Sequence, residues 1–289
     1  MSIAGGLPNA VARAHATGCD TLQVFTKSSG QWRARPLPDA EIEAFRRACV
    51  DLDVQPVLAH ASYLINLGSP DDALRTRSRT ALGEELDRAD ALGLLGVVLH
   101  PGSYTTTSEA EGLARIAEGI VAVLRERPDR RTMLLLEHTA GQGTNLGHTF
   151  EQLGAIIDAA EARGTPPIGL CLDTCHLVAA GYDLGSDASY ARTMAELELH
   201  VGRHRVRAIH LNDSKTPFGS RVDRHAHIGS GHVGLGAFRR VLTDPRFQTL
   251  PMVLETPKAN SRTAPADEPD PMDLDNLNTL RQLMNTPDP

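Results

Sequence analysis

Residues that commonly bind metal ions or move protons recur along this chain. The stretch 221-RVDRHAHIGSGHVG-234 holds three histidines and an aspartate within a loop-like composition. Other ionisable residues stand at or just beyond the ends of short apolar runs: His60, His100, Glu137, Asp173, His176, His210 and Glu255. Imidazole and carboxylate groups together are typical of sites for zinc, manganese or iron, and they also serve in acid–base catalysis.

Each of these residues has a simpler explanation when it is considered alone. A histidine at a strand end is usually a hydrogen-bonded structural residue, and a buried glutamate often pairs with an arginine. The whole set is harder to explain in this way, because several carboxylates in one cavity raise one another's pKa and destabilise the fold. Divalent cations remove that conflict. We therefore expect two or three metal ions, with a carboxylate bridging a pair.

The elements that must position these residues alternate along the chain. Short apolar runs predict strands over 21–26, 56–60, 96–100, 132–137, 168–173, 206–211 and 251–256. The segments between and around them predict helices over 8–17, 38–52, 70–92, 109–126, 149–163, 187–203, 236–243 and 272–284. Near-continuous apolar strands separated by helices indicate a buried parallel sheet. We expect one α/β domain over residues 1–289, a (β/α)₈ TIM barrel.

In such a barrel the active site lies on the face formed by the carboxyl ends of the strands. The ionisable residues that follow the apolar runs should therefore point into one cavity. Since 221–234 follows the strand expected over 206–211, Asp223 and His225 should join the rim of that cavity.

The predicted barrel has seven strands where a closed one needs eight. The chain begins 1-MSIAGGL-7, immediately before the first helix. Either the first strand is absent or the translation start has been placed too late. The second interpretation is favoured, because losing a central strand would expose both of its neighbours. A loop is expected over 258–271, before the last helix.

Composition narrows the class of protein. With 41% apolar and 22% charged residues, the chain is typical of globular proteins. No apolar run approaches the roughly 18 residues that span a membrane, and no signal peptide is apparent, so we expect no membrane association. Four scattered cysteines without a CxxC pair indicate a cytoplasmic compartment, with Cys171 and Cys175 as buried filler. The net charge of −7 argues against a nucleic-acid partner, but bound divalent ions would offset it locally.

Several motifs resemble those of the endonuclease IV family of apurinic/apyrimidinic DNA-repair enzymes. They follow the family order and extend over most of the chain: 23-QVFTKSSGQWR-33, 60-HASYLINLGSP-70, 99-LHPGS-103, 137-EHTAGQGTNLG-147, 173-DTCHLVAAGYDL-184, 210-HLNDSKTPFGSRVDRHAHIGSGHVG-234 and 253-VLETP-257. The run over 210–234 and the DTCH motif are highly specific. The resemblance implies a barrel of the xylose-isomerase type, a monomer and a duplex DNA substrate that carries abasic sites.

The activity that the resemblance implies is hydrolysis of the phosphodiester on the 5′ side of an abasic site. The products would be a 3′-hydroxyl and a 5′-deoxyribose phosphate, and the reaction would use three zinc ions. Manganese or iron could replace zinc at one position. Glu137, which would bridge two ions, and Glu255, which would help to orient the nucleophile, are the expected catalytic residues.

The resemblance also assigns the ligands of each ion. His60, His100 and Glu137 would hold one zinc. The second would take Glu137, Asp173, His210 and Glu255, and the third His176, Asp223 and His225. His227 and His232 are then expected to be supporting or loop residues.

Contacts with DNA are expected from the loops around this site. Tyr63 and Leu64 match an apolar wedge that the family pushes into the gap at the lesion; the alternative is that they pack their own loop. The matching motifs also imply DNA contacts for a set of polar and aromatic residues: Lys27, Gln31, Trp32, Arg33, Lys215 and Arg224.

The chain departs from the family pattern in addition to lacking the first strand. Gly30 stands where an arginine that inserts into DNA is expected, so lesion recognition should be weaker. His138 follows Glu137 where asparagine is usual, which should alter the surroundings of the metal.

Two other functions fit parts of the pattern. A sugar isomerase or epimerase of the same barrel superfamily needs only one or two ions, usually with a lysine or paired glutamates for acid–base work. The third ligand set, His176 with Asp223 and His225, is not needed there. A non-catalytic protein that binds abasic DNA would retain the site but not cut.

Overall fold

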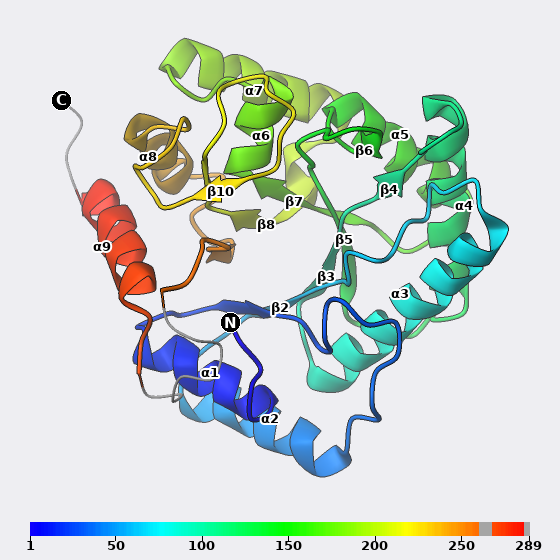
Figure 1. Cartoon of the computed structure of the whole chain (residues 1–289), viewed down its shortest axis with the longest axis horizontal. Coiled ribbons are helices and arrows are strands. Elements are labelled where there is room, and N and C mark those ends of the chain that lie inside the picture. Colours follow the sequence, from blue (N-terminus) through cyan, green and yellow to red (C-terminus); the bar gives the residue numbers. More distant parts are fainter. Residues whose placement is uncertain (260–267, 286–289) are drawn as a thin grey trace.

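Seven parallel strands form the centre of the molecule in the computed structural model, which describes residues 1–259 and 268–285. In spatial order they are β1 (Leu22–Val24), β2 (Val57–His60), β3 (Gly96–Leu99), β5 (Met133–Glu137), β7 (Gly169–Asp173), β8 (Val206–His210) and β11 (Met252–Val253). Adjacent strands pair in parallel. Figure 1 shows helices arranged around these strands. The architecture is a (β/α)₈ barrel with one strand fewer than a closed barrel.

The surrounding helices agree closely with the sequence prediction. They are α1 (Leu7–Ala16), α2 (Asp39–Asp51), α3 (Asp72–Leu92), α4 (Glu109–Arg125), α5 (Phe150–Glu161), α7 (Asp187–His200), α8 (Leu235–Thr243) and α9 (Pro271–Asn285). Local capping explains several boundaries: the Asp71 side chain accepts from the first-turn amides of α3, and Ser108 forms a capping box with Glu111 at α4. No helix in the described part of the chain is both long and apolar enough to cross a bilayer.

The barrel interior is sealed below its carboxyl face by a compact apolar layer. Five adjacent strands contribute one fully buried side chain each: Leu58, Val98, Leu135, Cys171 and Ala208. A larger core fills the space between the strands and the helices. The expectation that Cys171 is buried filler is confirmed by its place in this layer. The layer gives the polar residues above it a rigid floor.

The barrel is open between β1 and β11. These two strands are the ends of the sheet, and no pairing joins them within the described residues. We call this gap the seam. A cavity of about 630 Å³ lies along it, with Leu22, Val253 and Leu280 of α9 among its lining residues. The ammonium group of Met1 donates to the Gln23 carbonyl at 2.7 Å, and burial lowers its pKa to about 6.

Some short elements above the strand ends were not predicted. They are the helix α6 (Thr174–Ala180), the 3₁₀ turn η1 (Arg203–Arg205) and two antiparallel ladders, β4 (Gly102–Ser103) with β6 (Asn145–Leu146) and β9 (Asp213–Ser214) with β10 (His225–Ala226). A two-residue ladder has too little periodicity to be recognised in a sequence. The predicted loop over 258–271 is irregular where it is described, α9 begins at Pro271, and residues 260–267 lie outside the described residues.

Candidate metal centre

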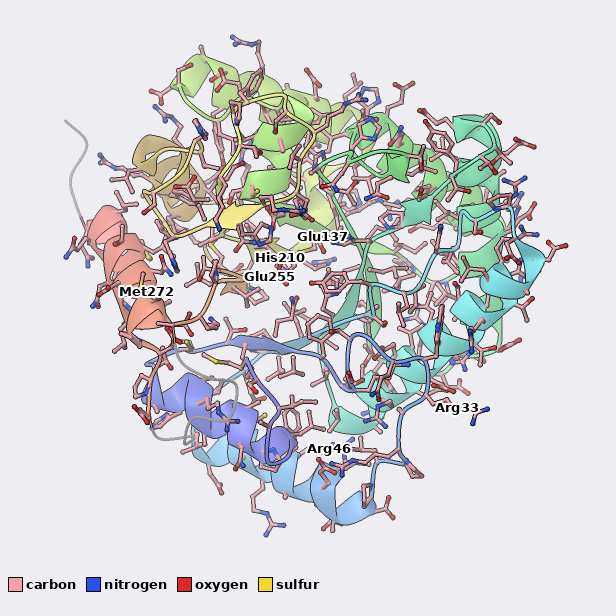
Figure 2. All side chains as sticks on the ribbon, viewed as in Figure 1. Arg33, Arg46, Glu137, His210, Glu255 and Met272 are labelled. Carbon is pink, nitrogen blue, oxygen red and sulfur yellow. The ribbon has the colours of Figure 1, made fainter. Side chains whose placement is uncertain are left out.

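The carboxyl ends of the strands bring the predicted ligands to one place. His60, Glu137, Asp173 and His210 are each the last residue of a strand. His100 follows β3, and Glu255 lies two residues beyond β11. Figure 2 shows Glu137, His210 and Glu255 close together near the middle of the ring of helices. The geometry follows from the parallel sheet, because all strands end on the same face.

The remaining three candidates come from the loop elements that were not predicted. Asp173 ends β7 and caps α6 by accepting from the His176 amide at 2.9 Å, so α6 holds His176 beside the strand end. His225 lies on β10, whose pairing with β9 folds the 221–234 loop back over the barrel. Asp223 precedes this strand. The loop identified in the sequence therefore does reach the strand ends.

The ligand atoms fall into four overlapping groups. Within each group the nitrogen, oxygen or sulfur atoms lie within 4.8 Å of one another. The groups are His60–His100–Glu137, Glu137–Asp173–His210–Glu255, His176–Asp223–His225 and Asp173–Cys175–His225. They line or underlie a cavity of about 610 Å³ at the barrel mouth. The first three groups have the same members as the three ligand sets that the sequence resemblance implied.

Several buried polar atoms in these groups are suited to binding cations. Glu137 Oε1, His176 Nε2, His210 Nδ1 and His225 Nε2 are buried without a well-formed hydrogen bond to any described residue. Carboxylate oxygens approach the three histidine nitrogens at 3.2 to 3.3 Å. Leaving four such atoms unsatisfied is costly, and a metal ion is the group that imidazole lone pairs and carboxylates would share. The residues present therefore fit divalent metals.

Backbone carbonyls fix the direction of three imidazole rings. The Nδ1 atom of His60 donates to the Ala61 carbonyl at 2.7 Å, that of His176 to the His138 carbonyl at 2.8 Å, and that of His225 to the Glu255 carbonyl at 3.2 Å. The Nε2 atom of each ring then faces the cluster. Hydrogen bonds on the far ring nitrogen are the usual way to orient a metal-binding histidine.

Charge compensation within the cluster is extensive. Burial by itself raises the pKa of Glu137, but the nearby imidazoles of His100 and His210 bring it well below the usual range. Burial opposes protonation of His225, yet Asp223 and Asp173 raise its pKa to about 9. Without metal, protons on the imidazoles thus balance the carboxylates. Metal ions would displace these protons.

Comparisons with known proteins identify the family. The family of xylose isomerase-like TIM barrels matches residues 11–281. A "Probable endonuclease 4" of Chloroflexus aurantiacus is 45% identical over 284 residues, which cover 98% of this chain and 96% of the relative. The chain belongs to the endonuclease IV family.

Solved structures agree with this assignment. The crystal structure of endonuclease IV from Thermus thermophilus matches with a TM-score of 0.84 and 39% identity, covering 98% of this chain and 97% of that one. A D-psicose 3-epimerase has a TM-score of 0.67 but is 18% identical, over 95% of this chain and 91% of that chain. The epimerase therefore shares the fold alone, whereas the likeness to endonuclease IV extends to the sequence.

Some of the residues that we expected to contact DNA lie beside the candidate metal centre, and others lie elsewhere on the surface. Tyr63 is 58% exposed and its ring lies 5.0 Å from that of His60 and 5.7 Å from that of His100, directly beside the ligands. Leu64 is half-buried next to it. Gln31, Arg33, Lys215 and Arg224 are exposed. Arg224 lines the cavity, whereas Figure 2 shows Arg33 at the outer edge of the molecule.

Lys27, another residue predicted to contact DNA, makes contacts within its own part of the fold in the structure. Its side chain is buried, with Nζ donating to the Trp32 carbonyl at 3.0 Å and lying 3.6 Å from Glu85 Oε1. Glu85 itself accepts from the Thr26 hydroxyl at 2.7 Å. The lysine therefore supports the loop from inside, because its long side chain turns toward the buried carboxylate of α3. Trp32 is half-buried beneath the Arg77 guanidinium, 4.8 Å from the ring centroid.

Gly30 and His138, the two residues that depart from the family pattern, have different surroundings in the structure. At Gly30 no atom of the described residues lies within 4 Å of where a Cβ atom would be, so the backbone accommodates a side chain there. His138 is fully buried against the rings of Phe150 and Tyr182, and neither of its ring nitrogens has a hydrogen-bond partner among the described residues. Its carbonyl, however, orients His176.

The remaining histidines of the 221–234 loop lie outside the ligand groups. His227 Nδ1 is 3.1 Å from the Asn276 amide nitrogen, and His232 is exposed. Cys175 does approach the cluster, but burial raises the pKa of its thiol to about 12, so the thiol keeps its proton in the metal-free protein. The loop therefore contributes Asp223 and His225 to the centre.

Sequence reasoning missed two amides beneath the ligands. Asn212 donates to Asp173 Oδ2 at 2.6 Å and accepts from the Glu255 amide at 2.8 Å. Gln23 donates to Glu255 Oε1 at 2.8 Å. The signal in the sequence was weak: a glutamine in the middle of the predicted strand 21–26, and an asparagine two residues after a histidine.

Proposed function

We propose that this chain cuts duplex DNA on the 5′ side of abasic sites, leaving a 3′-hydroxyl and a 5′-deoxyribose phosphate. As a member of the endonuclease IV family the chain is a nuclease, a hydrolytic DNA-repair enzyme. The single observation that carries the finer proposal is the set of three ligand groups, two of which share Glu137. An isomerase of this fold has no need of the group formed by His176, Asp223 and His225.

The three groups would hold three zinc ions, or two zinc ions with manganese or iron in the remaining position. Bound divalent ions lower the pKa of water, orient a phosphodiester and neutralise charge on the leaving oxygen. Glu137 is fully buried beneath the cavity, which suits a shared ligand. Glu255 is partly exposed to the cavity, so its carboxylate can also orient water near a bound phosphate.

Side chains at the mouth would receive the DNA. Tyr63 stands over two ligand histidines with an exposed ring, which suits stacking in the space left by a missing base. The exposed cations Arg224, Lys215 and Arg33 would pair with phosphates. We propose a monomer working in a reducing, cytoplasm-like compartment, in keeping with its four free cysteines.

The decisive experiment is incision of a duplex that carries one tetrahydrofuran abasic analogue. The expected result is a single cut 5′ to the analogue, with a 3′-hydroxyl that a polymerase can extend, and no cut in an intact duplex of the same sequence. A Glu137→Gln variant serves as the matched control for contaminating nucleases. Folded protein that carries about three metal ions per chain and binds the duplex without cutting would favour the binding-only alternative.

A further inference from the structure

We propose that Gln23 is a positioning residue that bridges the seam and sets the orientation of two metal-centre residues, His210 and Glu255. Its side-chain Nε2 donates to Glu255 Oε1 at 2.8 Å. Its Oε1 lies 2.9 Å from His210 Nε2. This inference rests on the proposed metal centre, but it concerns contacts that the ligand assignment does not include.

Glu255 needs such support because of its place at the seam. Its strand, β11, has two residues, and among the described residues it pairs only with β8, at Met252 with Ile209 and Val253 with His210. Glu255 lies two residues beyond that pairing. On the β8 side its amide donates to the Asn212 side chain at 2.8 Å. On the β1 side, a closed barrel would continue the sheet. Here the hydrogen bond from the Gln23 side chain supports Glu255 instead.

The chemistry of the contacts assigns the direction of the amide. An ionised carboxylate can only accept, so the NH₂ group of Gln23 must face Glu255. The carbonyl oxygen of Gln23 then faces His210, whose Nε2 must donate to it. A neutral His210 with its proton on Nε2 has its lone pair on Nδ1. That atom lies 3.2 Å from Glu255 Oε2 and 3.3 Å from Glu137 Oε1, at the centre of the ligand group.

The position of Gln23 in the fold allows it to hold both partners in a fixed orientation. It lies on β1, whose backbone is paired with β2, and it is 9% exposed. Its two amide contacts join residues 187 and 232 positions away in the sequence. A buried amide needs partners wherever it lies, so hydrogen bonding alone does not establish a role in the metal centre. The position of both partners among the ligands is the observation that points to one.

Substitution of Gln23 separates positioning from simple packing. Gln23→Met keeps the size of the side chain and removes both hydrogen bonds, and Gln23→Asn keeps the amide but shortens its reach. Gln248→Met is the matched control, because Gln248 lines the same seam cavity and is exposed. Zinc per chain is measured by mass spectrometry during dialysis against a chelator, together with kcat and KM on the tetrahydrofuran duplex and the Tm of the metal-free protein.

We expect Gln23→Met to lose zinc about 10-fold faster and to lower kcat about 10- to 100-fold, with KM within about twofold of the original chain. The zinc-loss rate and kcat of Gln23→Asn should lie between those of Gln23→Met and those of the original chain. Gln248→Met should match the original chain in both. Unchanged zinc retention and kcat in Gln23→Met would overturn the proposal. So would a lower Tm of the metal-free protein as the sole change. If Gln23→Met does not fold, Gln23→Asn with unaltered zinc retention and kcat would overturn it equally.

The same measurements distinguish this inference from the proposed function. An original chain that holds no zinc contradicts the metal centre itself. An original chain that holds zinc without cutting abasic DNA contradicts the proposed substrate, and the zinc-retention comparison still tests Gln23.

Discussion

The closed side of the barrel and the seam hold their ligands in different ways. On the closed side, β2, β3, β5, β7 and β8 are each paired on both edges, and their final residues or the next one provide His60, His100, Glu137, Asp173 and His210. At the seam, β1 and β11 are each paired on one edge, and Glu255 lies beyond the last pairing. Backbone hydrogen bonds thus place the candidate ligands of the closed side, whereas side-chain amides hold the candidate ligand at the seam.

Asn212 connects the two regions. One end of its amide holds the Asp173 carboxylate, which belongs to the closed side, and the other receives the backbone amide of Glu255. Gln23 makes the corresponding connection from β1. Open sheet edges are usually weak points of a fold. Here two buried amides stabilise the edge at the level of the site.

Removal of the metal ions should have the largest effect, since it leaves both regions without their shared partner. Chelation with 1,10-phenanthroline is expected to abolish incision and to lower Tm by at least about 5 °C, because ions that bind only the folded state stabilise it. Activity should return with added zinc. Incision that persists at zinc contents below about one ion per ten chains would contradict a metal-dependent mechanism.

On the closed side, Glu137→Gln tests the ligand that two groups share. The substitution keeps the shape of the side chain but removes the charge, so at least one ion should be lost and kcat should fall by about 10³-fold or more. Far-ultraviolet circular dichroism controls for folding. A fall of less than about tenfold would mean that the centre works without a shared carboxylate.

Asn212→Ala tests the connection between the regions. It removes the donor to Asp173 and the acceptor for the Glu255 amide, so kcat should fall about 10- to 100-fold with a smaller change in KM. Asn66 lines the same cavity but belongs to no ligand group, and its side-chain oxygen accepts from the Gly68 and Ser103 amides, so Asn66→Ala is the comparison variant. Equal effects of the two substitutions on zinc retention would remove the special role assigned to Asn212.

Hydrogen exchange tests the difference in backbone stability directly. Amides of Leu22–Val24 and Met252–Val253 should exchange at least about tenfold faster than those of Leu134–Leu136, because sheet edges open without disrupting the whole barrel. Mass spectrometry of peptides from the metal-loaded protein measures this ratio. Equal protection would show that the seam is as stable as the closed side.

The smallest effect is expected at the loop that precedes α2. Gly30→Arg adds a cation where the structure leaves open space, so KM for the abasic duplex should fall about two- to fivefold while kcat stays constant. Gly30→Ala controls for the loss of backbone freedom. A gain that persists at high salt concentration would argue against a phosphate contact, since such contacts weaken as salt rises.

Much of the fold could be predicted because its signals are local. Strands such as 132–137 are apolar throughout, as a strand buried on both faces must be, and helix starts such as Ser108 have capping side chains. The ladder formed by β9 and β10 could not be predicted, because its stability comes from pairing residues 213–214 with 225–226 above a preformed barrel. The burial of Lys27 was missed for the same reason, since it depends on Glu85 of a later helix.

The alternation of strands and helices, and the residue types at the strand ends, follow directly from the amino-acid sequence. Parallel strands that end on one face bring His60, Glu137 and His210 together whatever the details of packing. The orientation of these side chains depends on contacts that form in the folded barrel. The bonds of Gln23 and Asn212 join strands that are far apart in sequence, and such contacts exist only after the barrel has formed around them.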